Sequence, residues 1–367
     1  MKTATILTAP LLVLATAAPA LGLPARAPVE PVDLSVVPYA GTPQLDATAE
    51  RAVRGETSTR RKLEAIVRLI FDRRHGLGFE YASHPTLTAV EAFERRRGNC
   101  LSLVNLFVAL SRGAHIRTFF VEVEDLETFE RRDGAVVRST HVVGGFDLGA
   151  ELRTVDFLPD RPKTYRRLRI LSDREATAHY FNAVGAEALL GGEIARAEPL
   201  LRRALELDPE LAEAWNNLGL TARRAGRREE AITHLERALA IEPEFVPALE
   251  NLSGLYRIAG DGERAAAAAA RALELKTRNP YYLLTRALDG LRAGRLDEAE
   301  SLARRARRLD RGIPEVHLVL GRVALARGDD RAAEKSFARA QRLSAELPAT
   351  YRDRLETKID RLLASAL

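Results

Sequence analysis

A period of 34 residues runs through the C-terminal half of this chain of 367 residues. Glycines recur at that spacing from Gly192 to Gly328, and alanines recur at it from Ala197 to Ala333 and from Ala204 to Ala340. Small residues at fixed positions let two antiparallel helices approach closely, and a glycine suits the end of a helix because it tolerates a positive φ. The period therefore predicts an array of helix pairs that buries a continuous core and presents a concave surface.

The best-preserved unit of this period spans residues 212–243. It reads AEAWNNLGLTARRAGRREEAITHLERALAIEP, with Trp215, Gly219, Ala231 and Pro243 in register. The unit resembles a tetratricopeptide repeat, and five such units fit between residues 178 and 345. The resemblance implies an all-α solenoid over residues 173–345, in which the first helix of each pair lines the concave surface. The amphipathic tail over residues 346–367 is expected to form a capping helix.

We expect the concave surface to bind a peptide or a protein partner. Paired asparagine side chains carry amide groups that match an extended peptide backbone. The alternative is that these residues are ordinary solvated positions. The candidate groove residues are Asn182, Asn216, Asn217, Asn251, Arg223 and Arg257.

The N-terminus predicts export. Lys2 is followed by an apolar run and by a small-residue end at Ala18-Pro19-Ala20, a pattern typical of a secretory signal peptide over residues 1–22. An N-terminal anchor that is never cleaved is the alternative. Residues 23–57 contain five prolines and no sustained periodicity, which predicts a Pro-rich linker. We therefore expect a periplasmic or secreted protein with no transmembrane segment after signal removal.

Composition excludes several classes of function. The formal net charge is +5, and the arginines alternate with acidic residues, so we expect no nucleic-acid partner. The chain has one cysteine, Cys100, which excludes an internal disulfide and any site made of several cysteines. His75, His84 and His115 form no recognisable metal set with that cysteine. We therefore expect neither a metal nor a cofactor.

The segment 58–172 has the pattern of an α+β domain. Periodicity predicts its helices, and aromatic and β-branched residues predict its strands. The charged stretch 124–133 is expected to be a loop. The predicted helices cover 62–73, 88–96 and an apolar run that starts at Cys100, and the predicted strands cover 117–124, 135–146 and 151–158.

The order of cysteine, histidine and aspartate in this segment fits nucleophilic catalysis. Cys100 opens the apolar helix, and a helix N-terminus lowers the pKa of a thiol through its macrodipole and amide groups. On the second and third predicted strands, His141 would take the thiol proton and Asp156 would hold the imidazole in one tautomer. Asp147 competes for the third role. The alternative for Cys100 is a small buried apolar side chain.

These motifs resemble the transglutaminase-like superfamily, whose fold is papain-like. The resemblance rests on Arg97-Gly98-Asn99-Cys100 before an apolar helix, on Ser139-Thr140-His141-Val142-Val143 and on Thr154-Val155-Asp156-Phe157. It implies an α+β papain/transglutaminase-like domain over residues 58–172, with a catalytic Cys100, a base His141 and an orienting Asp156. The only glutamine before the repeats is Gln44, so Asn99 and the Cys100 backbone amide are the candidate oxyanion donors.

Two functions are compatible with this sequence. The first is an exported thiol enzyme, a peptidase or amidase or an acyl transferase on peptide or protein amides, whose repeat array recruits substrate or partner. Hydrolysis and transfer share the acyl-enzyme and differ in whether water or an amine resolves it. The second is a non-catalytic protein-binding scaffold with a degenerate transglutaminase-like domain. The three candidate side chains favour the enzyme, and the missing oxyanion glutamine favours the scaffold.

Overall fold

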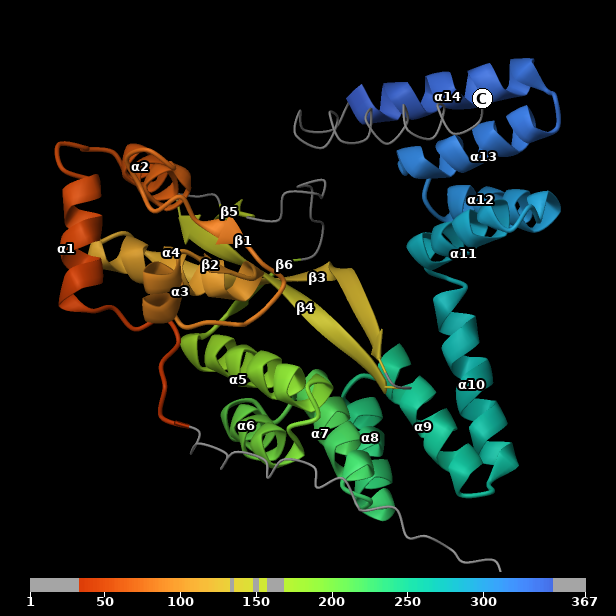
Figure 1. Ribbon diagram of the computed structural model, residues 1–367, viewed down its shortest axis with the longest axis horizontal. Coiled ribbons are helices and arrows are strands. Elements are labelled where there is room, and N and C mark those ends of the chain that lie inside the picture. Colours follow the sequence, from red (N-terminus) through yellow and green to blue (C-terminus); the bar gives the residue numbers. More distant parts are fainter. Residues whose placement is uncertain (1–32, 133–134, 148–151, 157–167, 346–367) are drawn as a thin grey trace, which may run out of the picture. The chain divides into compact units, whose positions relative to one another are not determined.

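The computed structural model describes residues 33–132, 135–147, 152–156 and 168–345. The predicted signal peptide over residues 1–22 and the predicted capping helix over residues 346–367 lie outside these ranges. An α+β domain is followed by an array of paired helices (Figure 1), which confirms the predicted fold class. Crossing a bilayer takes a long apolar helix, and the described part of the chain holds none.

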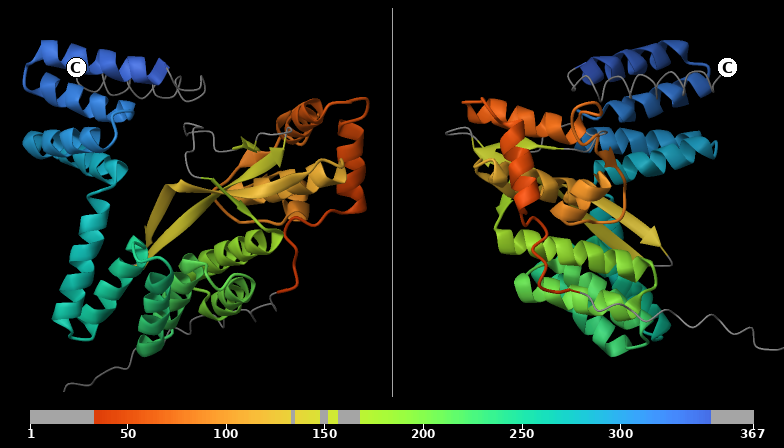
Figure 2. Two further views of the ribbon diagram at one scale, coloured as in Figure 1. Left: turned by 180° about the vertical axis from the view of Figure 1, so that it is seen from behind. Right: turned by 60° about the vertical axis from the view of Figure 1, so that its left-hand side comes forward.

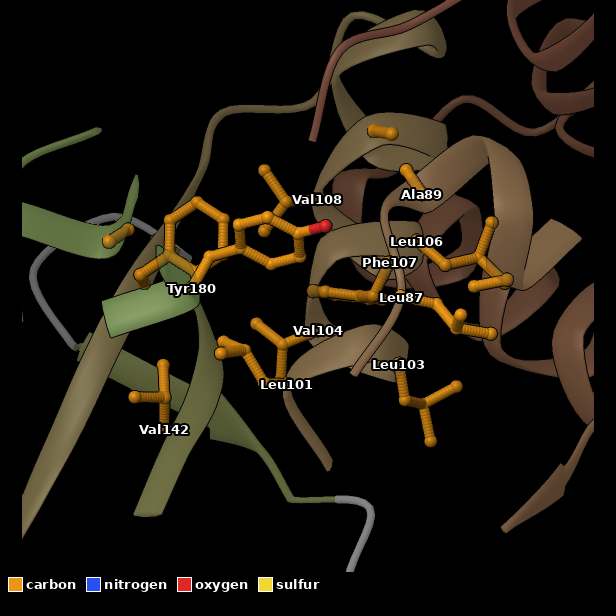
Figure 3. Close-up of a cluster of buried hydrophobic side chains, with 14 of the residues drawn as sticks. Leu87, Ala89, Leu101, Leu103, Val104, Leu106, Phe107, Val108, Val142 and Tyr180 are labelled. Carbon is orange, nitrogen blue, oxygen red and sulfur yellow. The ribbon is translucent and has the colours of Figure 1, made fainter. Parts of the chain in front are cut away.

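The core of the first domain is built around helix α4, Cys100–Gly113. All side chains from Leu101 to Ser111 are buried, so this helix is covered on every side. Helices α2 (Thr59–Phe71) and α3 (Ala89–Arg95) pack against it. Figure 3 shows leucines of α4 on the side of Leu87, and Leu101 and Val104 on the side of Val142.

A helix lies within the segment that was expected to be a linker. Helix α1 spans Pro43–Ala52, and the hydroxyl of Thr42 caps it by accepting a hydrogen bond from the Leu45 N–H at 3.2 Å. Leu45 and Ala49 are buried in the same core as α4. The predicted linker over residues 23–57 therefore contains a helix of the first domain, and the prediction that this domain begins at residue 58 is wrong. The helix was missed because only this narrow stripe, one turn long, is apolar and buried.

The main sheet has four antiparallel strands in the order β5-β4-β3-β6. A short parallel pair, β1 with β2, lies directly before α4. Phe107 of α4 lies on the sheet at Gly144, where a Cβ would come within 2.7 Å of the ring. The strands are β1 (Glu80–Tyr81), β2 (Arg97–Gly98), β3 (Thr118–Arg132), β4 (Ala135–Asp147), β5 (Leu152–Val155) and β6 (Leu168–Leu171).

Strands β3 and β4 form a longer hairpin than expected. Residues 127–132 pair with residues 135–140, after a register shift between Val123 and Glu127. The prediction of a loop over residues 124–133 is wrong, because β3 continues to Arg132. The sequence did carry a signal for this hairpin. Asp133-Gly134 is the dipeptide that favours a two-residue turn between antiparallel strands.

Ten helices form five antiparallel pairs over residues 173–345. The recurring glycines, Gly192 to Gly328, all adopt a φ between 72° and 81°, so they end the first helix of each pair as the period predicts. The recurring alanines are all buried. The helices are α5 (Asp173–Leu190), α6 (Ile194–Leu207), α7 (Ala212–Arg224), α8 (Arg228–Ile241), α9 (Val246–Ile258), α10 (Gly262–Lys276), α11 (Pro280–Arg292), α12 (Leu296–Leu309), α13 (Pro314–Ala326) and α14 (Asp330–Ala345).

The first repeat is bonded to the first domain. Arg112, near the end of α4, forms a bidentate ion pair with Asp173 at the start of α5, with N–O distances of 2.7 and 2.8 Å. Leu106 of α4 and Tyr180 of α5 also belong to one buried apolar cluster. The domain and the beginning of the array therefore share a core rather than being joined by a flexible linker.

Candidate active site

Cys100 is the first residue of α4 and is half-buried. The preceding residue, Asn99, caps the helix, because its Oδ1 accepts hydrogen bonds from the N–H of Ser102 at 3.0 Å and from its hydroxyl at 2.9 Å. A Cβ on Gly98 would lie 2.6 Å from the Cβ of Ser102, so this close approach requires a glycine. The thiol is therefore placed at the positive end of the helix dipole.

Two polar residues of the apolar helix hold a neighbouring segment beside Cys100. The Ser102 hydroxyl accepts a hydrogen bond from the Leu87 N–H at 2.8 Å, and the Asn105 amide donates one to the Leu87 carbonyl at 3.1 Å. Both polar side chains are completely buried. Neither residue was predicted to be functional, although a polar residue within an apolar helical run is a signal for such a role.

The side-chain amide of Asn99 points to Thr86. Its Nδ2 donates a hydrogen bond to the Thr86 Oγ1 at 2.6 Å. One N–H of the Asn99 amide is therefore already bonded to Thr86. Its predicted role as an oxyanion donor stays a prediction, whereas its role as the cap of α4 is a feature of the structure.

Replacing Asn99 by alanine is expected to lower the free energy of unfolding by about 1 kcal/mol, because the Ser102 N–H loses its acceptor. Urea denaturation of the two proteins measures the difference. Asn99→Ser is the control, since serine is an equally good capping residue and is expected to retain most of the stability. An alanine variant as stable as wild type would contradict the capping role.

Strands β4 and β5 bring His141 and Asp156 together. Val155 pairs with Gly144, so Asp156, the next residue, lies diagonally across from His141. The distance from His141 Nε2 to Asp156 Oδ1 is 3.1 Å, and the two side chains are only 4% and 2% exposed. A carboxylate accepts hydrogen bonds, so Nε2 is the donor and Nδ1 is the basic nitrogen of the neutral ring.

Helix α4 packs on the strand that carries His141. Leu101 follows Cys100 and Val142 follows His141, and both belong to one buried cluster (Figure 3). The structure thus pairs His141 with Asp156 and places Cys100 at the start of a helix that lies against β4. Within the described ranges, no three histidine, cysteine or acidic side chains gather as a metal site requires.

A cavity of about 650 Å³ lies between α2 and strands β4 and β5. Its wall is largely apolar and includes Leu63, Phe146 and Val155, and arginines such as Arg153 also line it. Val155 is the residue before Asp156, so the cavity adjoins the strand that leads into the candidate site. No local sequence pattern indicates this cavity, because its walls come from segments about 90 residues apart.

The four predicted groove asparagines bond to one another. Asn217 donates to Asn182 at 2.9 Å, Asn216 donates to Asn217 at 3.1 Å, and Asn251 donates to Asn216 at 2.8 Å. All four are buried, so they are not solvated positions, and their role in binding a peptide stays a prediction. This asparagine ladder links the first helices of three successive pairs, α5, α7 and α9.

The two predicted groove arginines differ in their surroundings. Arg223, on α7, is half-buried, and burial lowers the pKa of its guanidinium, with a smaller contribution from the neighbouring Arg224. Arg257, on α9, is exposed.

The β3–β4 hairpin reaches the same part of the array. Strand β4 contacts both α7 and α9, and Figures 1 and 2 show the end of the hairpin beside α9. A segment of the first domain therefore lies against the helices that were predicted to bind a peptide.

Comparison with known families defines both parts of the chain. Residues 46–145 match the family model described as the transglutaminase-like superfamily. Residues 212–245 and 284–348 match models described as tetratricopeptide repeats. The chain thus carries a transglutaminase-like domain followed by tetratricopeptide repeats, which confirms the predicted families and their order. The first match begins within α1, in agreement with the packing of that helix in the domain.

Solved structures match about half of the chain at low identity. A crystal structure of MamA is 20% identical with a TM-score of 0.26, and the match covers 46% of this chain and 93% of that one. YrrB, described as a TPR protein with an unusual peptide-binding site, is 19% identical with a TM-score of 0.26, covering 49% and 92%. BtubC from P. vanneervenii is 21% identical with a TM-score of 0.27, covering 47% and 82%. None of the curated proteins matches the chain.

Proposed function

We propose that this protein is a thiol enzyme of the transglutaminase-like class that cleaves or transfers peptide or protein amides. Cys100 is the nucleophile, His141 the base and Asp156 the group that orients the base. The observation that carries the proposal is the buried contact of 3.1 Å between His141 and Asp156, because a base that acts through Nδ1 needs its Nε2 held in place. The position of Cys100 at a helix N-terminus supports its role.

The proposed reaction has two steps. The Cys100 thiolate attacks the amide carbonyl, a carbon–sulfur bond forms as the carbon–nitrogen bond breaks, and the His141 imidazolium gives its proton to the leaving amine. Water or a second amine then attacks the thioester while His141 accepts its proton, and the thiolate leaves. Water makes the protein a peptidase or amidase, and an amine makes it an acyl transferase.

The oxyanion of each step needs hydrogen-bond donors. We assign the main role to the Cys100 backbone amide, which belongs to the first turn of α4. Asn99 is the second candidate, although it already donates to Thr86. That bond is the observation that favours the alternative function, a non-catalytic protein-binding scaffold.

The repeats are proposed to recruit a protein substrate or partner. Tetratricopeptide repeats and the concave face of α5, α7 and α9 support binding of a peptide or protein. A ligand on this face must share it with the β3–β4 hairpin, which contacts α7 and α9. Because β4 also carries His141, recruitment would take place next to the strand that holds the base.

We further propose that the protein is exported and acts in the periplasm or outside the cell. The pattern of residues 1–22, with Lys2, an apolar run and a small-residue end, supports this location. In such an oxidising compartment, a single cysteine that forms no internal disulfide is a liability, so its presence favours a use for the thiol.

The proposed enzymatic function is tested by measuring the rate at which iodoacetamide labels Cys100 in the folded protein as a function of pH. We expect labelling to follow an apparent pKa well below the usual value of about 8.5 for a thiol. Mass spectrometry of the labelled peptide measures the rate, and Cys100→Ser, which removes the chain's single cysteine, gives the background. Slow labelling with an ordinary thiol pKa would contradict the proposed enzymatic function and favour the non-catalytic scaffold.

A further inference from the structure

A chain of hydrogen bonds runs from the first repeat helix to the N-terminus of α4. The carboxylate of Glu187 on α5 accepts from the Thr86 N–H at 2.9 Å and from the Thr86 hydroxyl at 2.7 Å. The same hydroxyl oxygen accepts from Asn99 at 2.6 Å, and Asn99 caps the helix that begins with Cys100. Thr86 is 5% exposed, so water does not readily replace these bonds.

The carboxylate sets the direction of every bond in this chain. An ionised carboxylate only accepts, so the Thr86 hydroxyl must donate to Glu187 and keep its oxygen lone pairs for Asn99. Asn99 must then turn its NH₂ group to Thr86 and its Oδ1 to the Ser102 N–H. Without the acceptor at Glu187, the hydroxyl is free to donate to Asn99 instead, and a flipped amide would present NH₂ to the helix and lose the cap.

We infer that Glu187 is a positioning residue for the nucleophile, acting through Thr86 and Asn99 on the first turn of α4. The inference rests on the proposed function for its effect on the thiol. According to this inference, α5, the first helix of the repeat array, contributes to the geometry of the active site. Asp173 provides the comparison, because it also bonds α5 to α4 but does so at Arg112, near the opposite end of α4.

The test measures the pH profile of Cys100 labelling in matched pairs of variants. Thr86→Val has nearly the shape of threonine but lacks the hydroxyl, and Glu187→Ala lacks the acceptor. Both are expected to slow labelling at pH 7 about threefold to tenfold by raising the apparent pKa of the thiol, since a frayed first turn stabilises a thiolate less. Thr86→Ser keeps the hydroxyl and Asp173→Ala leaves the chain of bonds intact, so both are expected to keep the wild-type profile.

Amide hydrogen exchange gives a second measurement that does not depend on thiol chemistry. Exchange of the Ser102 and Leu103 N–H groups is expected to speed up in Thr86→Val and Glu187→Ala but not in Thr86→Ser. Wild-type exchange and a wild-type labelling profile in both of the first two variants would overturn the inference. If wild-type Cys100 has an ordinary thiol pKa, the proposed enzymatic function is contradicted. The exchange data alone then decide whether Glu187 orders the first turn of α4.

Discussion

Replacing His141 by alanine is expected to slow the labelling of Cys100 at pH 7 by up to about thirtyfold. In the proposed mechanism, the helix N-terminus and the imidazole both favour the thiolate, which is the reactive form. Thirtyfold is the upper limit, because it corresponds to a thiol with the ordinary pKa of about 8.5, which is about 3% ionised at pH 7, and the helix N-terminus still acts without the imidazole. The measurement is the second-order rate constant for iodoacetamide as pH is varied, read at Cys100 by mass spectrometry.

In the same experiment, Asp156→Asn separates the orientation of the His141 imidazole from the stabilisation of its positive charge. Asparagine has nearly the same shape, and its amide oxygen still accepts from His141 Nε2, but it does not stabilise an imidazolium as a carboxylate does. We expect a loss smaller than that of His141→Ala, with an unchanged fold by circular dichroism. The exposed His75 is the control histidine, and its replacement by alanine is expected to leave the rate unchanged. Equal rates in wild type and His141→Ala would remove His141 from the proposed mechanism.

Replacing Phe107 by alanine is expected to lower the free energy of unfolding by about 3–5 kcal/mol, the usual cost of removing a fully buried phenylalanine. Its ring has no exposed surface and lies on β4 at Gly144, so it joins the helix of Cys100 to the strand of His141. The surrounding core comes from several helices and the sheet and has little freedom to collapse into the space. Urea denaturation followed by circular dichroism measures the loss.

Phe71 provides the matched control for this prediction. It ends α2, and 39% of its surface is exposed. Phe71→Ala is expected to cost less than half as much as Phe107→Ala, because less apolar surface returns to water and no closed cavity forms. Similar losses in the two variants would show that the contact of α4 with the sheet is not the main support of the domain.

The sequence determined the repeat array almost completely. Each unit contacts mainly its neighbours, so a local pattern of 34 residues is enough to specify the structure of a pair. The glycines from Gly192 to Gly328 do adopt the positive φ that the period implies, and the recurring alanines are buried. The helix that begins at Cys100 was also predictable, because an uninterrupted apolar run bounded by Gly98 is a local signal.

The tertiary structure decided what the local signals left open. Helix α1 has a local cap at Thr42, but its packing on α4 is a contact between separate segments, and the hairpin continues beyond Val123 because each strand supplies the other's hydrogen bonds. The contact of His141 with Asp156 depends on the register of β4 and β5, which no single segment specifies.

The hydrogen-bond chain beside Cys100 shows most clearly which features the sequence indicated and which only the tertiary structure decided. Asn99 was a candidate from its place in a motif, whereas Thr86 and Glu187 carried no signal at all, since they are 101 residues apart and meet only when α5 packs beside the first domain. The asparagines Asn182 and Asn217 likewise read as surface positions and are instead buried between successive repeats. Local periodicity specifies which helices and strands form, but contacts between distant segments specify which polar groups bond, because a buried donor or acceptor bonds to whatever group the packing places beside it.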